Sequence, residues 1–421
     1  MKVLLVSANT ERLNMVTIPL GLGLVCAAVR AARHAVTFLD LLSETDPPAA
    51  VRAAIAKVQP DVIGISVRNI DDQNRDAPRF LLEQVEPLVG ACRAATLAPI
   101  VLGGAGYSLF PREALAYLGA DYGVCGDGEV VFPQLLECLE HGEDPGDLPG
   151  VYVAGREDRR GLAMAADLDA LPAWDESLTG TCDPSADDLW VPVQTRRGCP
   201  NDCSYCSTAR IQGRTIRSRD PHLTVAAIER LGQAGYRRFY FVDNSFNIPE
   251  SQALLICRLL RDLRPRVTWR CILYPHRVHE DLVRAMAEAG CSEASLGFES
   301  GSRRILREMN KRFSPEEVSE IVHLLAAYGI RRRGFLLLGG PGENRETVEE
   351  SLAFAHSLPL DELRITVGIR IYPGTPLASR AVADGVIRSE DDLLEPCFYL
   401  APGLEPWIHE RVAASSSRPT C

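Results

Sequence analysis

Short apolar strands alternate with helices in two separate stretches of the 421-residue chain, and this alternation constrains the fold more than any other feature. In the first stretch, residues 2–141, the predicted strands are Val3–Ser7, Val36–Leu39, Val62–Val67, Ile100–Leu102 and Tyr122–Cys125. Helices are predicted over 20–33, 48–58, 77–94, 111–118 and 128–140. This pattern favours an α/β fold with a doubly wound parallel sheet, which binds ligands at the carboxyl ends of its strands.

A second alternation begins at Trp190. Its predicted strands are Val191–Arg196, Phe239–Val242, Val267–Leu273, Ala294–Phe298, Gly334–Leu338 and Ile365–Ile371, and its predicted helices are 222–234, 250–263, 279–289, 315–328 and 345–357. About six such units favour a partial (β/α)6 barrel, whose active site lies at the carboxyl ends of the strands. We therefore expect a first domain at 1–141, a linker at 142–189, the barrel at 190–380 and a C-terminal extension at 381–421.

Three turns that contain glycine follow strands of the first stretch: Pro19–Gly23, Gly103–Gly106 and Gly126–Glu129. Glycine at such a turn lets the backbone approach a large flat ligand closely. Taken alone, the turns fit a nucleotide-binding fold or plain tight turns equally well. No G-x-G-x-x-G follows the first strand and no Walker lysine is present, so dinucleotide and ATP sites are not expected. The residues that we predict as ligand contacts are Pro19, Gly21, Gly103, Gly104, Gly126 and Glu129.

Composition limits the class of partner. The net charge of −11 argues against nucleic acid, because phosphate binding requires clustered Lys and Arg. The basic run Arg331–Arg333 is either a solvated strand entry or a grip for a carboxylate or phosphate. Likewise, Arg68–Asp72 is either a solvated loop or part of a face shared with the second domain.

The N-terminal apolar run is too short for a signal peptide or a membrane span, so we expect a cytoplasmic protein without a membrane partner. In that compartment the thirteen cysteines would be reduced. Most of them are expected to be small buried apolar residues. Cys271, Cys397 and Cys421 match no pattern.

Cys199, Cys203 and Cys206 form a C-x3-C-x2-C triplet directly after the first predicted barrel strand. Three thiolates can hold three irons of a cubane cluster and leave the fourth iron open to a small molecule. A zinc knuckle and reduced thiols in a turn are the alternatives. Structural zinc requires four ligands, and the nearest downstream histidine, His222, has no second ligand at a suitable spacing. We therefore predict these cysteines as the catalytic and metal-binding residues.

Four further segments accompany the triplet: Val242–Ser245, Leu296–Ser300, Gly334–Gly340 and Tyr372–Pro376. With them, the second stretch resembles the radical SAM superfamily, in which a [4Fe-4S] cluster binds S-adenosylmethionine (SAM). Carboxylates and backbone carbonyls can accept hydrogen bonds from the ammonium and hydroxyl groups of SAM. The resemblance implies SAM contacts at Tyr205, Asp243, Asn244, Glu299, Ser300, Leu338 and Gly339.

The three glycine turns of the first stretch resemble those of the cobalamin-binding domain that precedes many radical SAM enzymes, a Rossmann-like sheet. Ser7–Met15 lacks the D-x-H-x-x-G motif that supplies a lower axial histidine in other cobalamin proteins. His34 lies in the end of the first predicted helix, which is the wrong place for that role. Cobalamin would then bind without a histidine from this motif. A degenerate domain that holds no cobalamin is the alternative.

Together the resemblances imply a cobalamin-dependent radical SAM methyltransferase that acts on an unactivated carbon of a small-molecule or natural-product substrate. A flavodoxin- or ferredoxin-like protein would supply the electron. Asp243, Tyr274 and His276 could assist, although an ordinary loop histidine is the favoured interpretation of His276. One alternative is a radical SAM enzyme with a vestigial cobalamin domain that performs another reaction, such as transfer of the 3-amino-3-carboxypropyl group of SAM. A non-catalytic cluster or corrinoid carrier is the other alternative.

Overall fold

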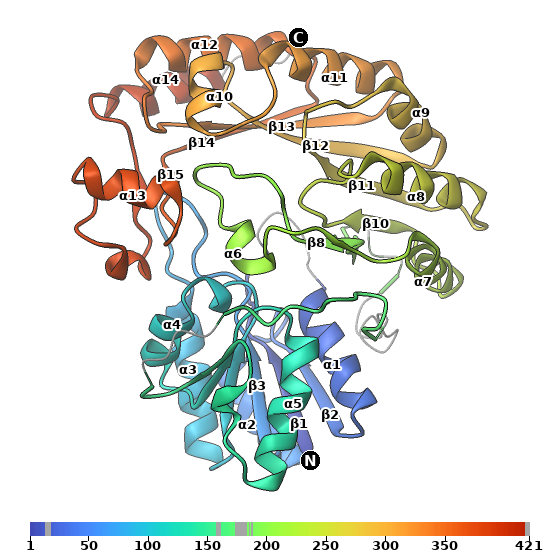
Figure 1. Cartoon of the computed structure of the whole chain (residues 1–421), viewed down its shortest axis with the longest axis vertical. Helices are drawn as coiled ribbons and strands as arrows, with labels where there is room; N and C mark the ends of the chain where they lie inside the picture. The colour runs from blue at the N-terminus through green and yellow to red at the C-terminus, as the bar shows by residue number, and fades with distance from the viewer. Residues whose placement is uncertain (13–17, 157–160, 173–182, 185, 187, 417–421) are drawn as a thin grey trace.

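Two parallel sheets, one in each half of the chain, form the protein in the computed structural model of Figure 1. The structure describes residues 1–12, 18–156, 161–172, 183–184, 186 and 188–416. Within these residues no helix combines the length and the apolar character that crossing a membrane requires.

The first sheet has the strand order β2-β1-β3-β4-β5-β6 and is parallel except for β6. Its strands are β1 (Lys2–Ser7), β2 (Ala35–Asp40), β3 (Val62–Ser66), β4 (Ile100–Gly103), β5 (Tyr122–Val124) and β6 (Val151–Val153). Its helices are α1 (Leu20–Ala31), α2 (Pro47–Val58), α3 (Leu82–Ala95), α4 (Pro111–Leu118) and α5 (Gly128–His141). Alternate residues of β1 lie in two separate hydrophobic clusters, so both faces of the sheet are buried, as its continuous apolar strands predict.

The second sheet is entirely parallel, in the order β14-β13-β12-β11-β10-β7. Its strands are β7 (Val191–Val193), β10 (Arg238–Phe241), β11 (Thr268–Leu273), β12 (Cys291–Glu299), β13 (Arg331–Leu338) and β14 (Glu362–Val367). The helices that connect them are α7 (Pro221–Gln233), α8 (Glu250–Asp262), α9 (Glu280–Glu288), α11 (Pro315–Ala327) and α12 (Arg345–Ser357). Since β7 and β14 are edge strands, the barrel is open, and the α/β fold class is confirmed.

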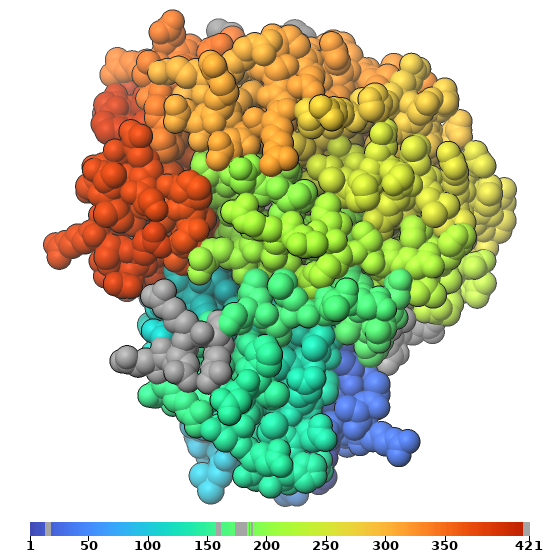
Figure 2. All heavy atoms as spheres, viewed as in Figure 1, coloured from blue at the N-terminus to red at the C-terminus, as the bar shows by residue number. Residues whose placement is uncertain are grey.

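Shorter elements complete the fold. The helices are α6 (Thr208–Gln212), α10 (Arg303–Glu308), α13 (Pro376–Ala383) and α14 (Trp407–Ser416), with 3-10 turns at Tyr107–Leu109, Pro145–Asp147 and Glu390–Leu393. The remaining strands form two antiparallel pairs: β8 (Arg196–Arg197) with β9 (Arg217–Ser218), and β15 (Ile369–Arg370) with β16 (Phe398–Tyr399). Figure 2 shows the residues around α6, in light green, filling the junction between the two halves on this face.

Three predicted elements need correction. The strand predicted at Ile365–Ile371 ends at Val367, because Gly368 has a φ of 79° that breaks the extended backbone. The helix predicted from residue 77 begins at Leu82, after a loop. The first helix ends at Ala31, so His34 lies beyond it, and its ring contacts the amino group of Met1 at 3.1 Å. Our domain boundaries stay predictions.

The carboxyl ends of the first sheet's strands face the segment that contains α6 and the cysteine triplet (Figure 1). Asp71, from the loop after β3, forms an ion pair of 2.7 Å with Arg370 of β15. Both side chains are buried, and Arg370 also donates to the carbonyl oxygen of Leu393. Of the two hypotheses for Arg68–Asp72, the structure therefore supports a face shared between the two halves.

Candidate active site

The cysteine triplet lies in a loop that is held from three sides. The Cys199 amide donates to Gly213 at 3.1 Å, and the Ser204 amide donates to Met309 at 3.1 Å. The carbonyl oxygen of Ser204 accepts from the Leu377 amide at 2.9 Å. All three thiols of the triplet are partly exposed, which leaves them accessible to a ligand.

Burial and a neighbouring cation act in opposite directions on these thiols, and the cation favours the thiolate form that binds iron. Burial raises the pKa of the Cys203 thiol to about 11, and the nearby Lys311 ammonium opposes that rise. Within the described residues, no three His, Cys, Asp or Glu side chains lie close enough to hold one metal ion. A four-iron cluster requires no such arrangement, because each cysteine binds a different iron. Three accessible thiols in one anchored loop therefore fit the cluster, although their ligand role stays a prediction.

Glu299, the last residue of β12, faces this loop. Its Oε1 accepts from the Tyr205 hydroxyl at 2.9 Å and from Lys311 Nζ at 3.2 Å. Glu299 has a φ of 62°, a strained conformation for a residue with a side chain, and such strain gathers at functional sites. Both described contacts use Oε1, which leaves Oε2 available to a hydroxyl group.

Asp243 lies just after β10, as the sequence predicts, but its carboxylate is already hydrogen-bonded within the protein. Its carboxylate accepts from the Thr195 amide at 2.8 Å, from the Thr195 hydroxyl at 2.7 Å and from the Arg196 amide at 3.1 Å. The side chain is 0% exposed. It therefore anchors the strand that leads into the cysteine loop, which argues against a direct contact with the SAM amino group. Asn244 donates to Gln212 at 2.9 Å, and Gln212 in turn accepts from the Gly198 amide.

Ser300 is also corrected. It follows the last residue of β12, and its hydroxyl oxygen lies 2.8 Å from that of Ser351 in α12, in a fully buried position. Leu338 and Gly339 lie at the end of β13, but their polar backbone groups are occupied. The Leu338 carbonyl oxygen accepts from Gly368, and the Gly339 amide donates to Glu343. The Leu338 carbonyl oxygen and the Gly339 amide are therefore not free to bind a ligand, and these residues can contribute an apolar surface instead.

At the carboxyl edge of the first sheet, protein packing explains two of the predicted glycines. A Cβ on Gly104 would lie 2.5 Å from the Val67 carbonyl oxygen, and a Cβ on Gly126 would collide with the backbone of Ala163. Both glycines also have positive φ, of 100° each. A Cβ on Gly21 would meet no atom within 4 Å, so Gly21 and the partly exposed Gly103 remain open to a ligand. Pro19 precedes α1 as its N-cap residue.

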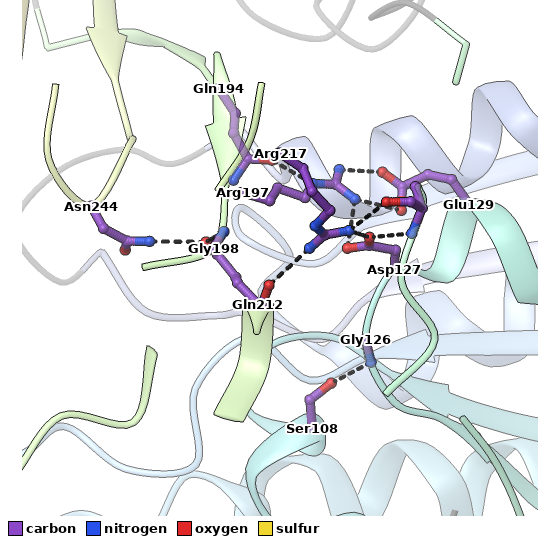
Figure 3. A network of polar contacts seen from close by, with 11 residues as sticks. Ser108, Gly126, Asp127, Glu129, Gln194, Arg197, Gly198, Gln212, Arg217 and Asn244 are labelled. Carbon is purple, nitrogen blue, oxygen red and sulfur yellow. Dashed lines mark hydrogen bonds and ion pairs between the residues drawn. The ribbon is translucent and has the colours of Figure 1, made fainter. Parts of the chain in front are cut away.

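Glu129, predicted as a ligand contact, instead joins the two halves of the chain (Figure 3). Its carboxylate pairs with Arg197 at 2.5 Å, and Arg197 also pairs with Asp127 at 2.8 Å. Arg217 reaches Asp127 from the other strand of the β8–β9 pair, at 2.5 Å. All four side chains are 10% exposed or less. The carboxylates of this turn are therefore occupied by arginines from the second half.

An open space remains beside this edge. A small cavity of about 20 Å³ lies at the carboxyl ends of β1 and β3, and Asn9, Arg68 and Asn69 contribute to its walls. Nη1 of Arg68 is buried without a hydrogen-bond partner among the described residues. A ligand that carries polar side groups would satisfy this atom, so the edge fits a cofactor of that kind.

Other predicted residues have ordinary roles. His276 Nδ1 lies 3.1 Å from Glu317, and the Tyr274 hydroxyl accepts from the Arg312 amide at 3.0 Å. In the basic run, Arg332 pairs with Asp361 at 2.5 Å and Arg333 pairs with Glu362 at 2.8 Å, so both are already bound to carboxylates. Cys271 is buried and Cys397 partly buried. Cys421 and the end of Ser7–Met15 lie outside the described residues.

Sequence reasoning missed three residues that the fold brings to the site: Arg197, Gln212 and Lys311. Arg197 stands two residues before Cys199, and that proximity was a usable signal. Lys311 lies between the apolar residues Met309 and Phe313, which hinted at a buried stem. Gln212 gave no signal, because its partners Gly198 and Asn244 are 14 and 32 residues away in sequence.

Comparison with known proteins identifies both halves. Residues 193–355 match the family model described as the radical SAM superfamily, and residues 6–136 match the B12-binding domain. The chain is 27% identical over 403 residues to an uncharacterized methyltransferase of Pyrococcus horikoshii, covering 92% of this chain and 84% of the relative. It is 24% identical to the tryptophan 2-C-methyltransferase of Streptomyces laurentii, covering 90% of this chain and 74% of that protein.

Among solved structures, the chain resembles the radical SAM methyltransferase TsrM from Kitasatospora setae with cobalamin and a [4Fe-4S] cluster bound. The TM-score is 0.84 at 21% sequence identity, and the match covers 99% of this chain and 90% of that one. At this identity the likeness bears on the fold, and it supports the arrangement of both sheets.

Proposed function

Because the chain is a radical SAM enzyme with an N-terminal B12-binding domain, of the cobalamin-dependent methyltransferase kind, we propose that it methylates a carbon atom of a small molecule. Its cofactors are a [4Fe-4S] cluster, SAM and cobalamin. The observation that carries the proposal is the position of Glu299 and Tyr205 beside the cysteine loop, at the edge that faces the B12-binding domain.

We assign the cluster to Cys199, Cys203 and Cys206, whose loop is anchored through Ser204 to Met309 and Leu377. When bound, the cluster would supply the electron for reductive cleavage of SAM, and cobalamin would supply the methyl group. The chain's own groups orient the substrates of this chemistry. Glu299 offers Oε2 to the ribose hydroxyls, and the Tyr205 hydroxyl fixes the carboxylate by donating to Oε1.

The B12-binding domain contributes the opposite wall. We propose that the corrin lies over the open glycines Gly21 and Gly103, with its polar side groups directed toward Asn9, Arg68 and Asn69. The ion pairs between Arg197 and the Asp127–Glu129 turn hold this wall against the cysteine loop. Because the side chains of Arg197, Asp127 and Glu129 are buried, the junction also restricts the access of water.

A small-molecule substrate is favoured by two observations. The named relative from Streptomyces laurentii acts on tryptophan, by its name. The charge of −11 argues against a nucleic-acid substrate, as stated above. An electron carrier of the flavodoxin or ferredoxin kind is the proposed reductant.

The proposal is tested with anaerobically reconstituted protein, SAM, methylcobalamin and a chemical reductant. Radical methylation predicts 5′-deoxyadenosine together with S-adenosylhomocysteine, because a second SAM regenerates the methyl group on cobalamin. Methylthioadenosine as the main product would instead indicate transfer of the aminocarboxypropyl group. Absence of all three products, with the cluster and corrin both bound, would support the carrier hypothesis.

A further inference from the structure

Lys311 is a buried residue to which the proposed mechanism gives no role. It lies in the turn after α10, and the residues just before it contact the cysteine loop. Met309 accepts from the Ser204 amide at 3.1 Å, and Asn310 donates to the Asp202 carbonyl oxygen at 3.2 Å. The Lys311 side chain is only 5% exposed. A lysine this buried is rare unless it has a partner.

The ammonium group has one anionic partner and a wall of aromatic rings. Nζ lies 3.2 Å from Oε1 of Glu299. The ring centroids of Tyr205, Phe313 and Tyr274 lie 5.2, 5.8 and 6.0 Å from the same nitrogen. Rings at such distances attract a cation through their negative faces, and they also exclude water. The charge of Lys311 therefore acts through a medium of low polarity.

The charge is retained in that medium. Burial alone would lower the pKa of Lys311, but Tyr205, Glu299 and Cys203 outweigh burial and hold the pKa well above its usual value. Tyr205, whose ring centroid lies 5.2 Å from Nζ, stands between Cys203 and Cys206 in the sequence, so the ammonium lies beside the cysteine loop.

We propose that Lys311 is a positioning residue that supplies positive charge beside the cysteine loop, at Tyr205, and thereby stabilises the reduced state of the cluster. Adding an electron to a cluster held by three thiolates increases its negative charge, and a nearby buried cation lowers the cost of that step. The same side chain orients Glu299, because it binds the oxygen that Tyr205 also binds. This inference rests on the proposed cluster site.

The test is a redox titration of the cluster in the reconstituted full-length chain, followed by electron paramagnetic resonance, without SAM or substrate. Lys311→Met keeps an unbranched apolar stem among the rings but removes the charge. We expect a more negative midpoint potential, with the ratio of reduced to oxidised cluster at a fixed potential falling about tenfold or more. Lys311→Arg keeps the charge and should stay close to the wild type.

Arg312→Gln is the matched control. Arg312 is the next residue, it is a cation and it pairs with Asp202 of the same loop, but its side chain is 54% exposed. Water screens an exposed charge, so the control should shift the potential much less than Lys311→Met.

A second variant covers the risk that Lys311→Met leaves Glu299 as a lone buried charge and prevents folding. Glu299→Gln/Lys311→Met removes both charges, and its potential should still fall, by less than in the single variant. The inference is overturned if the folded neutral variants keep the wild-type potential, or if Lys311→Arg loses the cluster as well, since shape rather than charge would then decide. Failure of the wild type to assemble a cluster would instead overturn the proposed function.

Discussion

The two sheets present their carboxyl edges to each other, yet acidic side chains have different roles at the two edges. At the first edge, Asp127 and Glu129 form ion pairs with arginines from the other half of the chain. At the second edge, the contacts of Glu299 with other described residues use Oε1, and the three cysteines of the triplet are partly exposed. A polar residue at the carboxyl end of a strand can therefore dock two domains or bind a ligand, and burial together with ion pairing distinguishes the two roles.

The largest expected difference between the edges concerns their cysteines. Cys203→Ala should abolish both the bound iron and the cleavage of SAM, because a thiolate ligand is lost. Cys125→Ala, at the end of β5, removes a buried thiol that contacts the Ser108 carbonyl oxygen at 3.6 Å. It should leave the iron content unchanged. Iron analysis and quantified 5′-deoxyadenosine measure both effects, and equal iron loss in the two variants would contradict the assignment.

The two glutamates should differ next. Glu299→Gln should lower kcat/KM for SAM by roughly 10- to 100-fold, since a charged hydrogen-bond acceptor is lost. Glu129→Gln should change that constant by less than about threefold, because Glu129 contacts Arg197 rather than a ligand. Its effect should appear in the denaturation midpoint of the apoprotein. Equal kinetic losses would show that both edges bind SAM.

Alanine variants of two glycines at the first edge distinguish a role in protein packing from a role in ligand binding. Gly126→Ala should destabilise the apoprotein by more than about 4 kcal/mol, because its Cβ would collide with the Ala163 backbone at a positive φ. Gly21→Ala should be tolerated in the apoprotein, since the site is open and alanine favours a helix. Urea denaturation measures both. If Gly21→Ala weakens corrin binding at unchanged stability, Gly21 is a contact of the cofactor.

The smallest effect concerns pH. Glu343 is buried beneath the Gly339 turn, and its carboxylate accepts a hydrogen bond from the Gly340 amide at 2.8 Å. Glu129, by contrast, forms an ion pair with Arg197. Burial raises the pKa of Glu343 to about 7. Between the usual pKa of a glutamate and pH 7 the folded state then binds more protons than the unfolded state, so stability should fall with rising pH, by about 3 kcal/mol at most. Glu343→Gln should lack this decline in urea denaturation at pH 5, 6 and 7.

Local pattern was sufficient to predict most of the fold. The helix at 345–357 and the helix at 111–118 have the predicted bounds, because each begins at a recognisable cap or proline. The strand predicted through Ile371 was wrong beyond Val367, since a glycine within an apolar run does not reveal its φ. Hydrophobic periodicity therefore locates elements better than it locates their interruptions.

The site was less predictable, because it depends on distant partners. The two segments that contain Asp243 and Ser300 were visible in the sequence. That their side chains are already hydrogen-bonded within the protein was not. Thr195 is 48 residues from Asp243, and Ser351 is 51 residues from Ser300. A motif shows which residues reach the edge of a sheet. Only the packed structure shows which of them still have a free atom there.

The position of Arg197 has a consequence for assembly. It pairs with the Asp127–Glu129 turn and stands two residues before Cys199, so separating the two sheets pulls on the chain that enters the cysteine loop. The docking of the two sheets and the order of the cysteine loop are therefore coupled, and a ligand held between the sheets is expected to stabilise that loop. The corrin-loaded protein should accordingly hold its cluster longer in air than the corrin-free protein.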